Sequence, residues 1–225
     1  MAYERNSDCW YLDVCDNDCK SCIRYSEMKY LMDNSGIPKN RQSPRELTAG
    51  VSDYDVFCSL AEIKSNIVDF VNNGRNIFIT SNNTGNGKTS WAIKLLTKYF
   101  DSIWAGNGFR VRGMFIHTPT LLLQLKNFSD PLSETYKKNL LNCDLVVFDD
   151  IADTSVSAYD YSNLLMIIDY RIQNEKSCIY TSNRTTKKQL EEAVGVRIAS
   201  RIWETSFIAV LKGKDRRNGS LTNYQ

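Results

Sequence analysis

The feature that most constrains this chain is the stretch 76–99, NIFITSNNTGNGKTSWAIKLLTKY. It begins with an apolar run (77–80) of the residue types that buried strands favour, and it ends in a segment whose apolar residues follow helical spacing. Between them lie a loop with two glycines and then Lys88 and Thr89. A strand, a glycine-containing loop, a Lys-Thr pair and a helix in this order are typical of a phosphate-binding P-loop.

Each residue type in this loop has a physical role in binding a polyphosphate. Gly85 and Gly87 can adopt backbone angles closed to other residues, so backbone N–H groups can surround phosphate oxygens. Lys88 would reach the β- and γ-phosphates, and the Thr89 hydroxyl would ligate Mg²⁺. The usual pattern has glycine where this chain has Asn82; asparagine tolerates left-handed backbone conformations, so the turn remains feasible. The predicted contacts of the loop with the nucleotide are Asn83, Thr84, Gly85, Asn86, Gly87, Lys88, Thr89 and Ser90.

A second motif predicts the metal-binding and water-activating groups. Asp149 and Asp150 follow the apolar run 145–148, and a central parallel strand reads as such a run because both of its faces are buried. Ligands collect at the carboxyl ends of such strands, so we expect Asp149 to hold Mg²⁺ through its water shell. Asp150 would orient the attacking water as a general base. Because aspartate is shorter than the glutamate that many ATPases use here, slow hydrolysis is expected.

Other polar residues are assigned by their position after predicted strands. Asn183 follows the predicted strand 178–181 and could hydrogen-bond the γ-phosphate or the attacking water. The only histidine, His117, ends the predicted strand 111–117 and is expected to be structural or to cap the backbone. Predicted helices follow at 118–125 and 131–141, and another spans the apolar positions from Leu60 to Val71.

The basic end of the chain predicts recognition of an anion. Residues 184–217 contain nine basic and four acidic residues, and Arg197 and Arg201 are four apart, on one face of a predicted helix. An arginine that projects from a helix can reach the γ-phosphate of a neighbouring subunit. A solvated basic face and phosphate contacts with nucleic acid are the alternatives.

Four of the seven cysteines, Cys9, Cys15, Cys19 and Cys22, lie close together near the N-terminus. Four thiolates on a short loop can form a tetrahedral Zn²⁺ site, and such a site can fold a segment too small to fold alone. An iron–sulfur cluster would use the same ligands, and free cysteines in a flexible tail are the alternative without a metal. We predict zinc.

Composition sets the outer limits of the interpretation. The chain has 225 residues and a formal net charge of +2, so one full domain with a small appendage fits and no partner is required by overall charge. No apolar run reaches the length of a membrane span, and the N-terminus lacks a signal-peptide core. A cytoplasmic protein without membrane partners is therefore expected, with its cysteines as thiols or metal ligands.

Together these motifs resemble the AAA+ replicative helicase loaders of the DnaC/DnaI type, including phage-encoded versions, and the related IstB-type transposition ATPases. The resemblance covers roughly residues 28–217. The segments that carry it are SGIPKN, TGNGKTSWA, FIHTPTLLLQL, DLVVFDDIA, IIDYRIQNEKSCIYTSN, VGVRIASRI and GKDRR.

The resemblance implies an α/β fold: a P-loop AAA+ (ASCE) three-layer sandwich with a central five-stranded parallel sheet and no helical lid. A Cys-rich, zinc-binding region with a linker (1–45) would precede the ATPase domain (46–225). Lys88 and Thr89 match the Walker A pair, Asp149 and Asp150 match Walker B, and Asn183 matches sensor 1. Arg201 matches the arginine finger with Arg197 as its companion, and Arg217 matches an arginine that senses nucleotide within the subunit.

The function implied is that of an ATP-dependent helicase loader. It would bind ATP and Mg²⁺, form a homo-oligomer in the ATP state, bind single-stranded DNA and deliver a DnaB-type hexameric helicase through its zinc region. Hydrolysis would be slow and stimulated by DNA. An IstB-type ATPase that delivers a transposase on duplex DNA is the nearest alternative; a P-loop kinase and an interaction module with a degenerate ATPase site are more distant ones.

Overall fold

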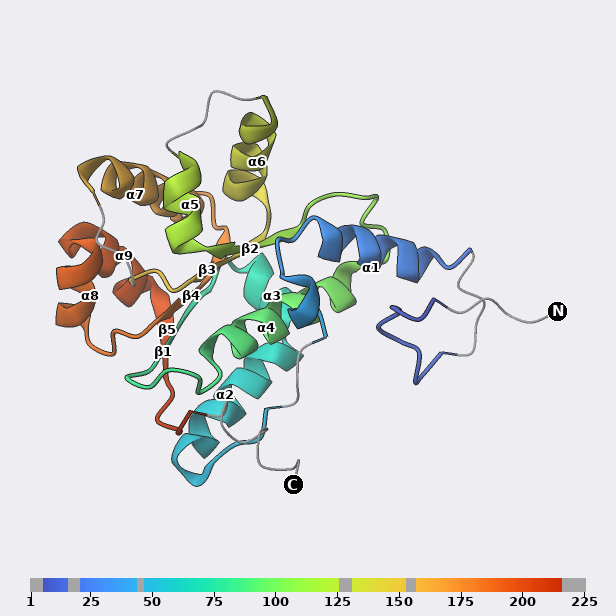
Figure 1. The fold of residues 1–225 in the computed structure, drawn as a ribbon, viewed down its shortest axis with the longest axis horizontal. Helices are drawn as coiled ribbons and strands as arrows, with labels where there is room; N and C mark the ends of the chain where they lie inside the picture. Colours follow the sequence, from blue (N-terminus) through green and yellow to red (C-terminus); the bar gives the residue numbers. More distant parts are fainter. Residues whose placement is uncertain (1–5, 16–20, 44–46, 126–130, 153–156, 216–225) are drawn as a thin grey trace, which may run out of the picture.

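A computed structural model describes residues 6–15, 21–43, 47–125, 131–152 and 157–215 of the chain, and its centre is a sheet of five parallel strands (Figure 1). The strands are β1 (Asn76–Thr80), β2 (Gly113–His117), β3 (Leu145–Asp149), β4 (Ser177–Ser182) and β5 (Ser206–Val210). Their order is β2-β3-β4-β1-β5, and every neighbouring pair is parallel. The predicted five-stranded parallel sheet is thereby confirmed.

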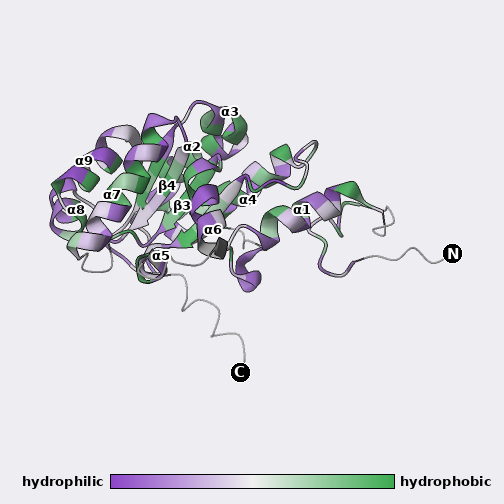
Figure 2. Cartoon of the chain, turned by 90° about the horizontal axis from the view of Figure 1, so that it is seen from above, coloured by the Kyte–Doolittle hydropathy of each residue, from purple (hydrophilic) through white to green (hydrophobic). Residues whose placement is uncertain are grey.

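Helices cover both faces of the sheet. They are α1 (Ile23–Asp33), α2 (Tyr54–Ser65), α3 (Ile67–Asn72), α4 (Lys88–Ile103), α5 (Thr118–Leu125), α6 (Pro131–Asn142), α7 (Ala158–Gln173), α8 (Lys187–Val194) and α9 (Val196–Thr205), with short 3-10 helices η1 (Lys39–Arg41) and η2 (Val51–Asp53). Helices α2 to α4 lie on one side of the strands and α7 to α9 on the other (Figures 1 and 2). The predicted three-layer sandwich is therefore also confirmed.

The alternation of side chains along the strands explains why their sequences are continuously apolar. In β3, Leu145 and Val147 belong to the hydrophobic cluster under α1 to α4, whereas Val146 and Phe148 belong to the cluster under α5 to α9. Successive side chains of a strand point to opposite faces, so a strand with a helical layer on each side needs apolar residues at every position.

One predicted helix is divided in two. The helix expected through Leu60 and Val71 breaks at Asn66, which has φ −108° and ψ 29° and lies between α2 and α3. The Ser65 hydroxyl donates a hydrogen bond to the Ala61 carbonyl at 3.0 Å, and the Asn66 amide donates to the Glu62 carbonyl at 3.2 Å. Such side-chain bonds compete with the helical ladder, and the apolar spacing alone does not reveal them.

The N-terminal helix α1 packs on the same core as α2 to α4. Met28, Leu31 and Met32 are buried in that cluster, and the Phe115 N–H of β2 donates a hydrogen bond to the Ser35 carbonyl at 2.6 Å. The division of the chain at residue 45 stays a prediction, and the described residues 21–43 are in contact with the sheet domain. In the part of the chain that the structure describes, no helix is long and apolar enough to cross a membrane.

Candidate functional site

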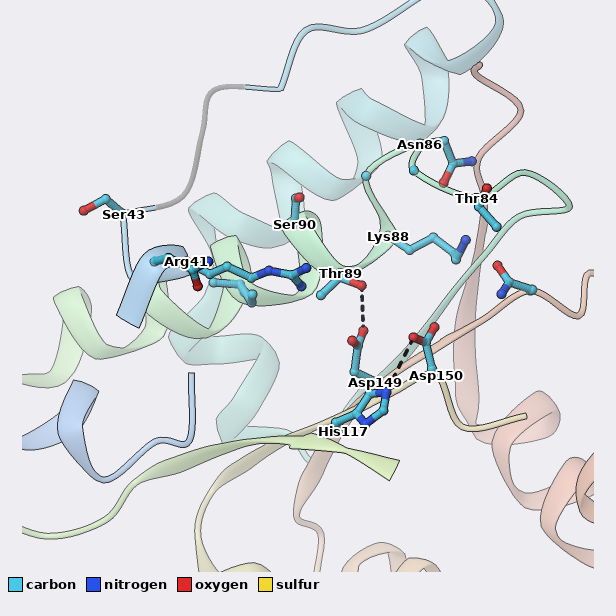
Figure 3. A pocket seen from close by; sticks show the side chains of 15 residues that line it. Arg41, Ser43, Thr84, Asn86, Lys88, Thr89, Ser90, His117, Asp149 and Asp150 are labelled. Carbon is cyan, nitrogen blue, oxygen red and sulfur yellow. Dashed lines mark hydrogen bonds and ion pairs between the residues drawn. The ribbon is translucent and has the colours of Figure 1, made fainter. Parts of the chain in front are cut away.

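A cavity of about 630 Å³ opens at the carboxyl edge of the sheet (Figure 3). The register pairs His117 of β2 with Asp149 of β3, so the strand ends meet at this edge. The cavity is lined by Asn40, Arg41, Ser43, Thr84, Gly85, Asn86, Gly87, Lys88, Thr89, Ser90, Ile93, His117, Asp149, Asp150 and Asn183. The two sequence motifs and Asn183, far apart in the chain, are thus brought to one place.

The loop between β1 and α4 has the backbone that its glycines predict. Gly85 (φ +68°) and Gly87 (φ +109°) are both left-handed, and α4 begins directly after Gly87. The Lys88 side chain lies across the loop, where its ammonium donates a hydrogen bond to the Asn83 carbonyl at 3.0 Å. Free N–H groups at a helix start, together with a lysine, suit the oxygens of a polyphosphate.

Asn82, the departure from the usual pattern, needs no left-handed backbone. Among the described residues other than glycine, only Phe109, Asp150 and Glu175 have positive φ. The Asn82 side-chain oxygen instead accepts a hydrogen bond from the Thr185 hydroxyl at 2.9 Å, which ties the start of the loop to the segment after β4. At the position where glycine is usual, the chain thus has a side-chain contact instead.

Asp149 is held in place by two hydroxyl groups. Both Thr89 and Thr181 donate to its Oδ1, at 2.9 Å and 2.7 Å respectively. Asp149 is only 4% exposed, and this burial raises the pKa of its carboxyl although the two hydroxyls act in the opposite direction. A threonine hydroxyl beside a carboxylate is an oxygen ligand set of the kind that Mg²⁺ prefers, so these residues fit a magnesium ion.

Asp150 lies at a sharp turn of the backbone. It has φ +54°, and its N–H donates a hydrogen bond to the Thr181 hydroxyl at 2.9 Å. Its Oδ2 is 4.0 Å from His117 Nε2 (Figure 3). His117 Nδ1 is 2.9 Å from the Thr120 hydroxyl. His117, expected to be structural, thus lines the cavity beside Asp150, the carboxylate expected to orient the attacking water.

Several residues near the nucleotide motifs are not identified from the sequence. Thr181 belongs to the Thr-Ser-Asn segment, and only its neighbour Asn183 was assigned a role. Asn40, Arg41 and Ser43 come from the stretch interpreted as a linker and line the cavity, and the Arg41 side chain reaches toward Thr89 (Figure 3). No local pattern marks them, since their position depends on how residues 35–37 dock on β2.

The arginines of the C-terminal part lie away from the cavity. Arg197 and Arg201 are both exposed on α9, and neither lines the cavity. Arg201 Nε is 2.7 Å from Asp169 Oδ1, and the arginine side chain is 53% exposed. Arg217 lies outside the described residues. The α9 arginines therefore remain accessible to another molecule.

The cysteine cluster is only partly described. Cys9, Cys15 and Cys22 are half-buried, and the Cys22 thiol accepts a hydrogen bond from the Tyr25 N–H at 3.5 Å, which caps α1. Cys19 lies outside the described residues. Within the part of the chain that is described, no three His, Cys, Asp or Glu side chains come together as metal ligands. Zinc stays a prediction from the sequence.

Comparisons with known proteins agree with the fold. Residues 54–196 match the family described as IstB-like ATP binding protein, whereas curated protein sequences give no match. The DnaC helicase loader has a similar structure, with TM-score 0.64 at 23% identity over 76% of this chain and 96% of that chain. DnaI has TM-score 0.58 at 16% identity over 81% and 92%. The initiator DnaA bound to AMPPCP and single-stranded DNA has TM-score 0.59 at 17% identity over 74% and 48%. At these identities the similarity establishes the fold alone, the α/β fold with its parallel sheet.

Proposed function

The chain belongs to the family of IstB-like ATP binding proteins, and from that premise we propose that it is an ATP-dependent loader of a replicative, DnaB-type hexameric helicase. ATP binding follows from the family. The observation that supports the loader is the similarity in fold to the DnaC helicase loader over 96% of that protein's length. DnaI, of similar size, is covered over 92%. A loader of this kind would act in the cytoplasm, where the sequence leads us to expect this protein.

The proposed ATP site uses the residues that the cavity brings together. Lys88 would contact the terminal phosphates, and Thr89 and Asp149 would hold Mg²⁺, which polarises the γ-phosphate when bound. Asp150 would orient the attacking water, with Asn183 within the same cavity as a donor to the γ-phosphate. The short Asp150 side chain supports slow turnover.

Assembly is the second part of the proposal. Arg201, exposed on α9, would leave Asp169 and complete the ATP site of a neighbouring subunit, with Arg197 beside it; Arg217 would contact the nucleotide of its own subunit. ATP would then lie between subunits, so ATP binding and oligomer formation would strengthen each other. The assembled subunits would hold single-stranded DNA, and the N-terminal region with its zinc would contact the helicase.

The decisive experiment is co-purification of the protein with a DnaB-type hexameric helicase, with and without ATP. We expect the wild type to retain the helicase, and Cys19→Ser to lose this retention while binding ATP normally. Zinc content measured on the same two proteins tests the metal, and Cys58→Ser, an exposed cysteine outside the cluster, serves as the control. Retention of the helicase by Cys19→Ser would contradict the N-terminal assignment.

The family match favours one alternative, an IstB-type ATPase that delivers a transposase. The two functions differ in the DNA they require. ATP turnover stimulated by single-stranded DNA supports the loader, whereas assembly on duplex DNA with retention of a transposase supports the alternative. A protein that binds ATP but never hydrolyses it, even when oligomeric, would instead be an interaction module.

A further inference from the structure

Two basic residues, Arg41 and Lys88, are found among the described residues that line the cavity. Figure 3 shows the Arg41 side chain reaching from η1 toward Thr89, on the opposite side of the cavity from Lys88. The residue belongs to neither sequence motif. Among the described residues, no hydrogen-bond or ion-pair partner is found for its guanidinium, which leaves its donors available to a ligand.

The backbone that carries Arg41 is fixed to the sheet. The Ser35 carbonyl accepts a hydrogen bond from the Phe115 N–H at 2.6 Å, and Ile37 is buried in the core. Gly36 has φ +76°, and a Cβ there would lie 2.7 Å from the Phe115 carbonyl oxygen, so the chain can pass this close to β2 only with glycine. From this anchor η1 begins, with the Arg41 N–H bonded to the Pro38 carbonyl at 2.8 Å.

The charge balance of the cavity favours a cation at this position. Asp149 and Asp150 bring two carboxylates to the cavity, and a triphosphate adds more negative charge than Mg²⁺ and Lys88 together neutralise. A guanidinium presents several N–H donors in one plane and is suited to phosphate oxygens.

We propose that Arg41 binds the phosphates of the nucleotide and thereby couples residues 35–43 to nucleotide occupancy. The inference rests on the proposed ATP site and names a regulation of it. Because Arg41 is joined to α1 through the segment docked on β2, a bound polyphosphate restrains η1, and the N-terminal helix is connected to the site by eight residues or fewer. Nucleotide binding and the order of this segment are then linked equilibria.

The chain offers a matched control. Lys39 lies on the same 3-10 helix, is exposed and carries the same charge, but does not line the cavity. Affinity for a fluorescent ATP analogue with Mg²⁺ is measured for the wild type, Arg41→Gln, Lys39→Gln and Lys88→Ala. We expect Arg41→Gln to bind about tenfold more weakly, which corresponds to about 1.4 kcal/mol, and Lys39→Gln to bind like the wild type.

Hydrogen–deuterium exchange of residues 37–43 supplies the second readout. In the wild type and in Lys39→Gln, the ATP analogue should slow exchange in this segment; in Arg41→Gln at saturating analogue it should not. Equal thermal stability of the variants shows that folding is unaffected, which is expected because Arg41 is exposed.

Two results would overturn the inference. One is equal affinity of Arg41→Gln and Lys39→Gln for the ATP analogue. The other is hydrogen–deuterium exchange in residues 37–43 of the wild type that does not change when the analogue binds. Failure of the proposed function looks different. In that case the wild type does not bind the analogue at all, or Lys88→Ala binds it as well as the wild type.

Discussion

At the scale of single residues, the most constrained group is the Asp149 carboxylate. It is buried, and its Oδ1 accepts from both Thr89 and Thr181. Burial raises its pKa, which means that the ionised form is disfavoured in the folded protein. A site that keeps a charge ready for a cation in this way lowers the stability of the unliganded protein.

This predicts that Asp149→Asn is more stable than the wild type without nucleotide, by about 1 kcal/mol near neutral pH. A carboxyl whose folded pKa is raised stabilises the fold most at low pH, and that contribution is lost as the pH rises through the folded pKa. The advantage of Asp149→Asn should therefore grow with pH, as measured by urea denaturation across the pH range.

The exposed Asp13→Asn is the control and should show no such trend. With ATP and Mg²⁺ the order reverses, because only the wild type gains stability from the bound metal. A wild type that is the more stable protein at every pH without ligand would contradict this account of Asp149.

At the scale of elements, Arg171 of α7 joins three segments on one side of the sheet. It is fully buried, and its guanidinium donates to the carbonyls of Leu140, Cys143 and Ser177 at 2.8, 3.0 and 2.7 Å. These carbonyls belong to the end of α6, the turn before β3 and the start of β4. One cation thus donates to main-chain oxygens of three separate segments.

Arg171→Gln should consequently lower the free energy of unfolding by about 3 kcal/mol or more, since several buried carbonyls lose their donors at once. Urea denaturation measures the change. The exposed Arg75→Gln removes the same charge at the start of β1 without burial and should stay within about 0.5 kcal/mol of the wild type. If Arg171→Gln lowered the free energy of unfolding as little as Arg75→Gln does, water would have to replace the guanidinium as the donor.

The elements differ in how far the sequence predicts them. β1 and β3 are predictable because burial on both faces requires continuous apolar runs, and the strand-loop-helix of residues 76–99 follows from local chemistry. The break at Asn66 is not, because it depends on polar side chains that bond to the backbone. The position of Arg41 is not predictable from the sequence either, because a contact between Ser35 and Phe115, distant in sequence, brings it to the cavity.

At the scale of the whole molecule, the proposed assembly of several copies would give a role to the α9 arginines, which do not line the cavity of their own subunit. Arg201 is 53% exposed and its partner in this subunit is Asp169. An exposed ion pair contributes about 0–1 kcal/mol, so Arg201 can exchange Asp169 for a phosphate at little cost. A head-to-tail contact between copies would place such an arginine at the next ATP site.

Mixing two inactive variants tests this arrangement. Lys88→Ala and Arg201→Ala should each have little ATP turnover, the first for lack of a phosphate contact and the second for lack of the neighbour's arginine. An equal mixture should recover about a quarter of the wild-type turnover, because a random pairing joins an intact Lys88 to an intact Arg201 that often. Lys187→Ala, on α8, is a control that leaves turnover unchanged.

If Arg201 acted within its own subunit, the mixture would show no recovery beyond the sum of its parts. Recovery without DNA, at high protein concentration, would further separate the assembly step from the effect of a DNA strand.

The contact of Ser35 with β2 has a consequence beyond the nucleotide site. β2 is the last strand on its side of the sheet, and an unpaired strand invites pairing with the strands of other molecules and thus aggregation. The Ser35 carbonyl takes up the outward N–H at the middle of this strand, and Gly36 lets the backbone lie against it. Residues 35–37 therefore cover that edge of the sheet, so that copies of the protein can come together at high concentration without pairing through their β2 strands.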